Sequence, residues 1–343
     1  MEKYIKIAGF LLFVVLLAGC GKKEVLFAGK TMGTTYHIKV VTGYFNDASH
    51  LRDKIIRRLE EINRSMSTYM KDSEISRFNA MKSTEEKFYI SDDFLQVMIA
   101  ARYLHEITDG AWDGTIKPLI NLWGFGNSEG KNHVPQAEEI NALLADTGFD
   151  QIDISGAGYL KKKNPAISLD LASIAKGYGV DQVAKLIETN RFRDFLVEIG
   201  GEVRASGFRK DGRHWRVGIN MPSPKAAYNE VYKAVNLHDR AFATSGDYRI
   251  FFEADDKRYS HILDPATGYP VINRVVSTSV MAPTCILADG LATALMVSGH
   301  ERGIELANRL ADTECLIVVQ EKDGAFTDYY SKEFEKFKVQ SSK

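Results

Sequence analysis

The spacing of hydrophobic residues changes several times along this 343-residue chain. Apolar and polar residues alternate through residues 36–40, which predicts an early strand. Between residues 47 and 65, leucines and isoleucines recur at intervals of three and four, which predicts a helix with one buried face. Later segments mix hairpin-like runs with helices and do not repeat a strand–helix–strand unit. This order predicts an α+β fold in one compact catalytic unit.

Capping residues and apolar stripes predict the other elements. Ser91 and Asp92 suit the start of a helix that Gly110 ends, and Pro135 opens another helix with acidic residues in its first turn. The remaining helices are expected at residues 173–190, 284–298 and 300–310, and the remaining strands at residues 167–171, 195–199, 215–219, 248–253 and 315–319.

The charge balance excludes one class of partner. The chain has 44 Lys and Arg residues against 45 Asp and Glu residues, a net charge of -1. Nucleic-acid binding depends on a basic surface, so no nucleic acid is expected as a partner. The hydrophobic content of 45% is typical of a packed globular protein.

The N-terminus has the layout of a secretory signal. Lys3 and Lys6 precede an apolar run, residues 7–18, that ends before Gly19-Cys20. At about 12 residues this run is too short to span a bilayer as a helix. The sequence Leu17-Ala18-Gly19-Cys20 resembles a bacterial lipobox, so we expect a signal peptide at 1–19, a lipidated tether at 20–27 that starts with Cys20, and a catalytic domain at 28–340.

This N-terminus places the mature protein on a bacterial membrane, facing the periplasm or the cell exterior, held by acyl chains. The alternative is an uncleaved anchor, or an unmodified Cys20 after an ordinary signal. Apart from Cys20 the chain has only Cys285 and Cys315, which we expect to be buried free thiols.

No standard catalytic motif is present, and the polar residues of interest lie in glycine-rich turns or at helix starts. Met32 precedes a flexible turn, Tyr69 follows a helix, and Gly110, Ala111 and Trp112 end another helix. Taken singly, each of these segments is more consistent with a structural role.

The segment from Asp170 to Gly179 carries more information. It lies where a buried strand is expected to turn into a helix, and a helix N-terminus with Lys176 nearby suits a phosphate group. In the alternative interpretation Asp170 caps the helix and Lys176 is a solvated side chain.

Two later segments offer a proton carrier and oxygen ligands. His261 precedes a tight turn, where it either carries a proton or satisfies a local hydrogen bond. Asp289 and Thr293 are four residues apart on a predicted helix, so their oxygens share one face. Mg²⁺ is usually held by a few such oxygens together with substrate phosphates. The alternative is a buried Thr293 bonded to a carbonyl and an Asp289 satisfied by backbone.

Read in order, these segments resemble the ApbE family, the FAD:protein FMN transferases. The resemblance covers about residues 31–299. It depends on the segments Met32-Gly-Thr-Thr-Tyr36, Ser67-Thr-Tyr69, Leu122-Trp-Gly-Phe-Gly126, Ile174-Ala-Lys-Gly177, Thr244-Ser-Gly-Asp-Tyr248, His261 to Pro270 and Asp289 to Thr293.

The resemblance implies an α+β enzyme with mixed, largely antiparallel sheets and packed helices. It would bind FAD and Mg²⁺, transfer FMN to a Ser or Thr hydroxyl of a partner protein, and release AMP. The implied partners are acceptor subunits of membrane redox complexes that carry covalent FMN. Carried over by position, the FAD contacts are Met32, Tyr69, Gly110, Ala111, Trp112, Asp170, Lys176, His261 and Ile262.

The resemblance also implies a metal site. Asp289 and Thr293 would hold the cation by side-chain oxygens, with backbone carbonyls near Ser173 and at Ala292. Lys176 would neutralise phosphate charge, and His261 or Asp289 would accept the proton of the incoming hydroxyl. The residues leave this choice of base open.

The chain departs from the family pattern at residues 113–119, at Ala172-Ser173 and at Ser260, where the family commonly has a His. Two other functions remain open from the sequence. One is an FAD pyrophosphatase that releases FMN and AMP, with water in place of the protein hydroxyl. The other is a flavin-binding lipoprotein without catalysis.

Overall fold

The computed structural model describes residues 21–43, 46–126, 133–227, 229–255 and 257–339. Its centre is an eight-stranded sheet in the order β1-β2-β6-β7-β10-β13-β14-β15, in which all neighbouring strands are antiparallel. The bounds are β1 Lys22–Thr31, β2 Thr34–Gly43, β6 Phe195–Ile199, β7 Glu202–Ser206, β10 Arg240–Gly246, β13 Val275–Ala282, β14 Glu314–Gln320 and β15 Phe326–Tyr330.

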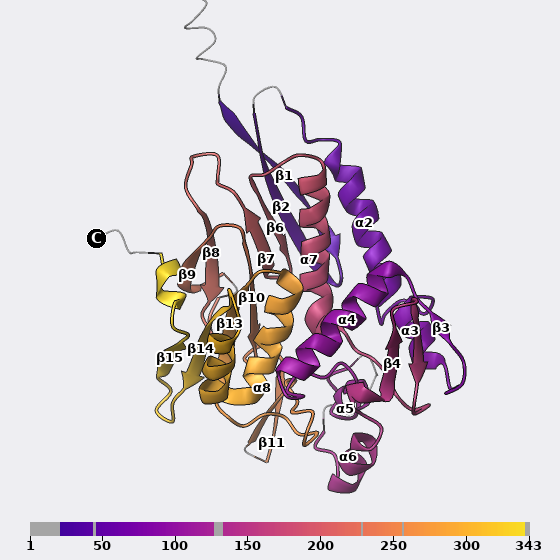
Figure 1. The fold of residues 1–343 in the computed structure, drawn as a ribbon. Coiled ribbons are helices and arrows are strands. Elements are labelled where there is room, and N and C mark those ends of the chain that lie inside the picture. The colour runs from indigo at the N-terminus through magenta and orange to yellow at the C-terminus, as the bar shows by residue number, and fades with distance from the viewer. Residues whose placement is uncertain (1–20, 44–45, 127–132, 228, 256, 340–343) are drawn as a thin grey trace, which may run out of the picture.

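Helices cover one face of this sheet (Figure 1). Helices α2, α7 and α8 lie on the sheet and α4 packs on them, and their apolar sides form one core with Ile38, Val40, Phe195 and Val197 of the sheet. The helix bounds are α2 Leu51–Met66, α3 Glu74–Ala80, α4 Asp92–Ile107, α5 Lys117–Leu122, α6 Ala137–Leu144, α7 Ala172–Thr189 and α8 Cys285–Arg309, with 3₁₀ turns η1 Phe149–Gln151 and η2 Phe334–Phe337. The predicted α+β class, with largely antiparallel sheets and packed helices, is confirmed.

A hairpin of β8 (Trp215–Asn220) and β9 (Val231–Leu237) covers the opposite face. Trp215 of the hairpin packs with Val41, Val203 and Phe242 of the sheet in a second core. The remaining strands form two small sheets, β3 Phe88–Tyr89, β5 Tyr159–Lys162 and β4 Ile152–Ser155 in one, and β11 Phe251–Ala254 with β12 Lys257–Ser260 in the other.

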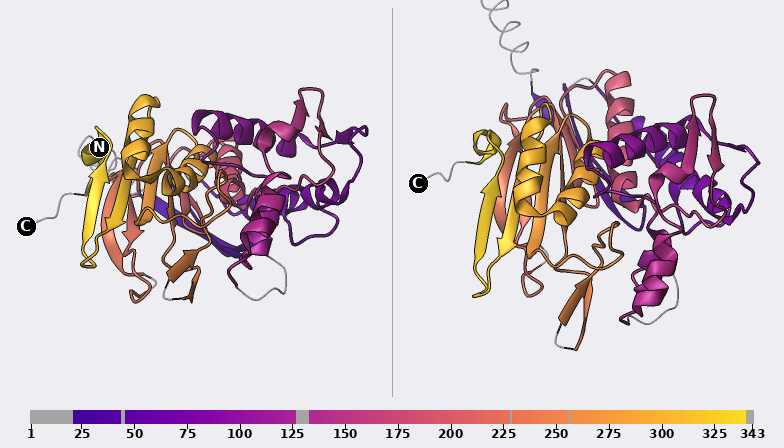
Figure 2. Two further views of the ribbon diagram at one scale, coloured as in Figure 1. Left: turned by 90° about the horizontal axis from the view of Figure 1, so that it is seen from below. Right: turned by 60° about the horizontal axis from the view of Figure 1, so that its bottom comes forward.

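The molecule has two distinct ends. β1 begins at one end, while the β11–β12 hairpin and the α5–α6 segment extend from the other (Figures 1 and 2). In the part of the chain that the structure describes, no helix combines the length and the apolar character that a membrane crossing requires.

Local sequence signals explain several boundaries. The Ser91 hydroxyl accepts a hydrogen bond from Phe94 N and starts α4, as its position predicts. The two helices predicted at residues 284–298 and 300–310 are the halves of α8, which is interrupted at Gly299 with φ 81° and ψ 174°. Only glycine adopts such a conformation readily, so the helix direction changes there.

Two local predictions are wrong. The apolar residues of the segment 167–171 are buried, but the segment forms no strand, because the Asn79 side chain takes the place of a neighbouring strand. Asn79 Oδ1 accepts from Leu169 N, and its Nδ2 donates to Leu169 O. The expected tether at residues 20–27 is also wrong where it is described, because Lys22–Thr31 form β1 and pair with β2 over their whole length.

The strand predicted at 248–253 begins later, at Phe251. The signal peptide at 1–19 and the lipidation of Cys20 fall outside the described residues and stay predictions. Cys285 and Cys315 are buried free thiols, as expected.

Candidate functional site

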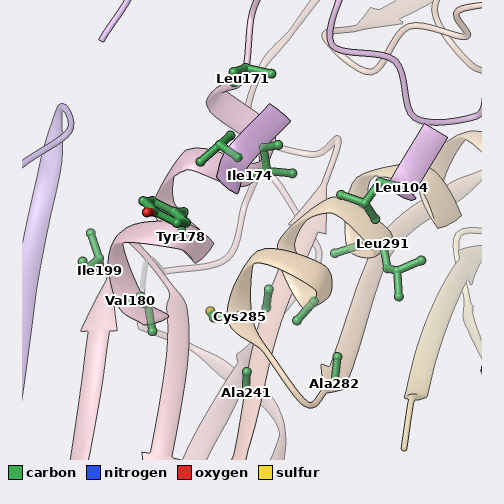
Figure 3. Close-up of a cluster of buried hydrophobic side chains, with 14 of the residues drawn as sticks. Leu104, Leu171, Ile174, Tyr178, Val180, Ile199, Ala241, Ala282, Cys285 and Leu291 are labelled. Atoms are coloured by element: carbon green, nitrogen blue, oxygen red, sulfur yellow. The ribbon is translucent and has the colours of Figure 1, made fainter. Parts of the chain in front are cut away.

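The candidate site is built where α7 crosses α8. Asp289 of α8 is 3% exposed, and its Oδ2 accepts a hydrogen bond from Gly177 N at 2.9 Å. A β-carbon at residue 177 would collide with the Cys285 carbonyl, so glycine is what allows the two helices to approach. Ile174 and Tyr178 of α7 and Cys285 and Leu291 of α8 lie in one buried cluster beside this crossing (Figure 3).

Asp289 shares this region with two other charged side chains. Lys176 Nζ lies 3.5 Å from Glu202 Oε1, and the Lys176 side chain is 27% exposed. Lys176 is therefore partly exposed and paired with a carboxylate. Glu202 Oε2 is buried and has no hydrogen-bond partner among the described residues.

Burial and mutual attraction shift the pKa values of all three groups. Burial raises the pKa of Asp289 to about 6, although the Lys176 charge acts in the opposite direction. Burial likewise raises the pKa of Glu202 to about 8, again opposed by Lys176. Burial alone would lower the pKa of Lys176, but attraction from Asp289 and Glu202 raises it overall. Lys176 is thus a permanent cation between two carboxyl groups.

Glu202 was not predicted from the sequence. It follows Gly200 and Gly201, whose φ values of 63° and 107° make the turn between β6 and β7. A β-carbon at Gly200 would lie 2.8 Å from Thr34 Cγ2 and 3.2 Å from Lys176 Cδ. Gly200 and Gly201 directly before Glu202 were the sequence pattern that could have indicated this residue, because a tight turn there brings Glu202 up to α7.

Thr293 lies on the face of α8 that carries Asp289. Its Oγ1 is 3.2 Å from Ser245 Oγ, at the end of β10. The described partner of Thr293 is therefore a neighbouring strand residue. Asp289, in turn, uses one oxygen on a backbone N–H, which fits part of the alternative interpretation of that residue.

The two predicted carbonyl ligands differ in their surroundings. In a regular helix the Gly177 N–H faces the Ser173 carbonyl, so the carboxylate that accepts from Gly177 lies near that carbonyl. The Ala292 carbonyl accepts a hydrogen bond from the Thr278 hydroxyl, and Ala292 is fully buried against β13. One of the two lone pairs of the Ala292 carbonyl oxygen is therefore already occupied by a hydrogen bond inside the core.

These oxygens suit a hard cation. A carboxylate, a hydroxyl and a backbone carbonyl are typical Mg²⁺ ligands. No group of three or more His, Cys, Asp or Glu side chains with a metal-binding arrangement occurs in the described ranges. A cation at this place would therefore depend on the mixed donor set of Asp289, Thr293 and Ser173.

His261 lies just after β12, and its surroundings fix its tautomer. Its ring Nδ1 is 3.1 Å from the Ile250 carbonyl, which also accepts from His261 N at 3.2 Å. A carbonyl only accepts, so Nδ1 carries the proton and Nε2 has a free lone pair. Burial lowers the pKa of His261, so the ring is neutral near pH 7.

A half-buried ion pair ties the β11–β12 hairpin, which leads into His261, to the end of β10. Arg258 of β12 donates to the Asp247 carbonyl at 2.7 Å, and its Nη2 is 3.4 Å from Asp247 Oδ1. Burial raises the pKa of Asp247 to about 6, although the Arg258 charge acts to lower it. Ser245, on β10 near Asp247, contacts Thr293. The ion pair therefore connects the β11–β12 hairpin to the part of α8 that carries Thr293. Among the described residues, no hydrogen bond or ion pair joins His261 directly to Lys176 or Asp289.

The predicted FAD contacts occupy varied positions. Met32 has φ 49° in the β1–β2 turn, and a β-carbon at Gly179 would lie 2.9 Å from its Cε. Tyr69 is 80% exposed, whereas the side chains of Trp112 and Ile262 are buried in the core. FAD contact by any of these residues stays a prediction.

Two of the predicted contacts also have structural roles. The indole N–H of Trp112 donates to Ser173 Oγ at 3.0 Å, which fixes the start of α7. Asp170 Oδ1 accepts from Ala172 N at 2.9 Å in the turn before α7, whose N-cap residue is Leu171 and not Asp170, and its Oδ2 is 3.9 Å from Lys117 Nζ. Gly110 has φ 77° and ends the α4 segment, followed by the half-buried Ala111.

Comparison with known proteins gives consistent results over nearly the whole chain. The model of the ApbE family matches residues 32–317. An FAD:protein FMN transferase of Vibrio cholerae serotype O1 is 45% identical over 327 residues, which are 94% of this chain and 96% of that protein. An FAD:protein FMN transferase of Haemophilus influenzae is 39% identical over 331 residues, 93% of this chain and 94% of that protein.

Solved structures agree with the sequence comparison. The flavin transferase ApbE from Vibrio cholerae superposes with a TM-score of 0.84 at 45% identity, covering 92% of this chain and 99% of that one. The apo form of the Pseudomonas stutzeri flavinyl transferase ApbE superposes with a TM-score of 0.82 at 38% identity, covering 92% and 96%.

Proposed function

Because the chain belongs to the ApbE family and is by that relationship a flavin transferase, we propose that it transfers the FMN part of FAD to a Ser or Thr hydroxyl of a partner protein, with Mg²⁺ bound and AMP released. The observation that carries this proposal is the meeting of Asp289 and Thr293 on α8 with Lys176 of α7. Oxygen ligands and a fixed cation beside one another are what a dinucleotide diphosphate requires.

The reaction replaces the phosphoanhydride bond of FAD with a phosphate ester bond. The acceptor oxygen forms a bond to the FMN phosphorus, the bond from that phosphorus to the bridging oxygen breaks, and AMP leaves with that oxygen. The hydroxyl proton passes to a base on the protein. No covalent protein nucleophile is needed, so charge neutralisation and positioning are the main contributions of the chain.

Asp289, Thr293 and the Ser173 carbonyl would hold the cation. Bound there, Mg²⁺ supplies neutralisation of the charge that develops on the phosphate oxygens. Lys176 contributes a second positive charge, which Glu202 holds in place from the β6–β7 turn. Met32, Tyr69 and the Gly110 to Trp112 segment would contact the rest of FAD.

His261 fits the role of the base better than Asp289. Its Nε2 lone pair is free while Nδ1 is fixed on the Ile250 carbonyl, and its lowered pKa keeps it unprotonated near pH 7. Asp289 already accepts from Gly177 and would also bind the cation, which leaves it less able to take a proton.

Mass spectrometry tests the proposal. A partner flavoprotein incubated with this protein, FAD and Mg²⁺ should gain the mass of FMN on a Ser or Thr, and should gain nothing in excess chelator. Assay of FMN and AMP without an acceptor separates this function from an FAD pyrophosphatase. A protein that binds FAD but forms neither product in any assay would be a flavin-binding lipoprotein without catalysis.

We also propose that Cys20 is lipidated after removal of residues 1–19, so that the enzyme works on a bacterial membrane, outside the cytoplasm. Its acceptors would be subunits of membrane redox complexes that carry covalent FMN. The intact mass of the protein recovered from membranes tests this, because an N-terminal Cys20 with a diacylglyceryl group has a defined mass increment.

A further inference from the structure

A cavity of about 570 Å³ lies on the face of the main sheet away from the helices. It is bounded by β1, β2, β6 and β7, by β8 and by the loop that leads into β8. Four cationic side chains line it, Lys39, Arg209, Lys210 and Arg216, together with the carboxylates of Glu24 and Glu198. We call it the basic cavity. It shares no lining residue with the candidate catalytic site.

Part of the positive charge in the basic cavity is neutralised and part is not. Lys39 Nζ is 3.7 Å from Glu24 Oε1, and Arg209 Nη2 is 3.3 Å from Asp211 Oδ2. Lys210 and Arg216 are exposed, and in the described ranges their side chains make neither a hydrogen bond nor an ion pair.

The carboxylates reduce this excess without cancelling it, because four cations face three carboxylates, Glu24, Glu198 and Asp211. Glu24 is occupied by Lys39, and Glu198 Oε2 lies 2.7 Å from His37 Nδ1 while its Oε1 accepts from Gly201 N at 2.8 Å. An anionic group is therefore the ligand that the basic cavity suits electrostatically.

The short stretch of chain between Cys20 and the basic cavity limits how far the cavity can lie from a membrane that holds Cys20. Its lining residue Glu24 comes four residues after Cys20, and a fully extended chain covers at most about 14 Å over that length. β1 begins at Lys22, so the described chain has strand structure almost from this point. A lipid on Cys20 would therefore keep the basic cavity at the membrane surface, within reach of phospholipid headgroups.

We infer that the basic cavity binds the phosphate headgroups of anionic phospholipids and holds this end of the sheet against the membrane. The inference depends on the proposed lipidation of Cys20, which brings the cavity there. Attraction to an anionic surface falls off within a Debye length of about 8 Å, so the cations must lie close to the headgroups to act.

Vesicle flotation tests the inference without the acyl anchor. All described helices and strands lie between residues 22 and 337, so a chain that begins at Gly21 contains each of them. This chain should float with phosphatidylcholine vesicles that contain about 30% phosphatidylglycerol and not with phosphatidylcholine alone. Binding should disappear near 1 M NaCl, where the Debye length is about 3 Å.

Charge removal locates the binding to the basic cavity. The double variant Lys210→Ala with Arg216→Ala should weaken vesicle binding about 30-fold, as expected for two cations at an anionic surface. The matched control Arg302→Ala with Lys322→Ala removes two exposed cations from α8 and the β14–β15 turn and should bind like the parent. FMN transfer to a soluble acceptor, measured without vesicles, should be the same in all three proteins.

Several results would overturn the inference. They are equal flotation on neutral and anionic vesicles, absence of flotation on anionic vesicles at low salt, and equal losses in the cavity variant and its control. Calorimetric binding of inorganic phosphate without vesicle binding would assign the cavity to a soluble anion instead. Failure of the FMN transfer assay alone would count against the proposed function and leave the vesicle result standing.

Discussion

Gly177 N donates to Asp289 Oδ2 at 2.9 Å, and this bond joins the first turns of α7 to the carboxylate expected to hold the cation. The same glycine allows the close approach of the Cys285 carbonyl on α8. Position 177 therefore determines both the helix crossing and the orientation of the Asp289 side chain.

Gly177→Ala should destabilise the protein by about 1–3 kcal/mol, because the added methyl group has no space against the α8 backbone. Urea unfolding followed by circular dichroism measures the change. Gly156→Ala is the matched control, since nothing lies within 4 Å of its β-carbon position, and it should change stability by less than about 0.5 kcal/mol. Equal effects at both positions would contradict the packing argument.

Asp289→Asn should retain the fold and lose at least about a hundredfold in the rate of FMN transfer. The asparagine oxygen still accepts from Gly177 N, but the negative charge that attracts a divalent cation is gone. Mass spectrometry of the acceptor measures the rate, and a Mg²⁺ titration should show a raised half-saturation. An unchanged Mg²⁺ requirement with full activity would remove Asp289 from the metal site.

His261→Asn should lower kcat about 10²- to 10⁴-fold while FAD affinity stays close to that of the parent. Asparagine can still donate to the Ile250 carbonyl, but it has no basic nitrogen in place of Nε2. FAD fluorescence measures binding and acceptor mass measures turnover. Wild-type turnover by this variant would show that another group accepts the proton.

Activity of the parent should fall on the acid side, at a pH below the ordinary histidine value of about 6.5, because burial lowers the pKa of His261. The ring must lose its proton to act as a base, so the rate rises with pH and then becomes constant. A pH profile of kcat/KM at saturating Mg²⁺ tests this. A fall in rate centred above pH 6.5 would contradict this assignment.

Stability without metal should decrease as pH rises from about 4.5 to about 8. Glu202 has a pKa raised to about 8 in the folded state, against an ordinary value of 4.5, so the folded state binds its proton more tightly than the unfolded state. The contribution of Glu202 to the free energy of unfolding is present at low pH and is lost as pH rises through 8. Lys176 stays charged throughout this window, because its pKa is raised.

Glu202→Gln should therefore lose less stability than the parent between pH 5 and pH 8. Urea unfolding in excess chelator at both pH values gives the comparison. Parallel pH dependence in the two proteins would show that Glu202 does not titrate in this range.

Much of the fold could be predicted from local patterns. The helix face between residues 47 and 65, the cap at Ser91 and the division of α8 at Gly299 are each determined by nearby residues. The run at 167–171 was misread because a strand and a buried extended segment have the same apolar pattern. Asn79, nearly 90 positions earlier, decides between them.

The candidate site likewise combines features that nearby residues determine with features that depend on residues far apart in the sequence. Asp289 and Thr293 were predictable because one helix places them on one face. Glu202 and the Asp247–Arg258 pair were not predictable, since the contacts of these side chains depend on which strands become neighbours. The β6–β7 turn reaches Lys176 only after the sheet has formed, and no spacing in the sequence expresses that contact.

β1 runs from the end of the molecule where the described chain begins to the turn beside α7. Ten residues of strand separate Lys22, beside the proposed anchor, from Met32 in the turn near α7. At about 3.3 Å per residue they extend over some 30 Å. With Cys20 fixed in the bilayer, the reaction would take place up to that height above the lipid. Acceptor proteins whose target hydroxyl is held far above the membrane would then be out of range, whatever their local sequence.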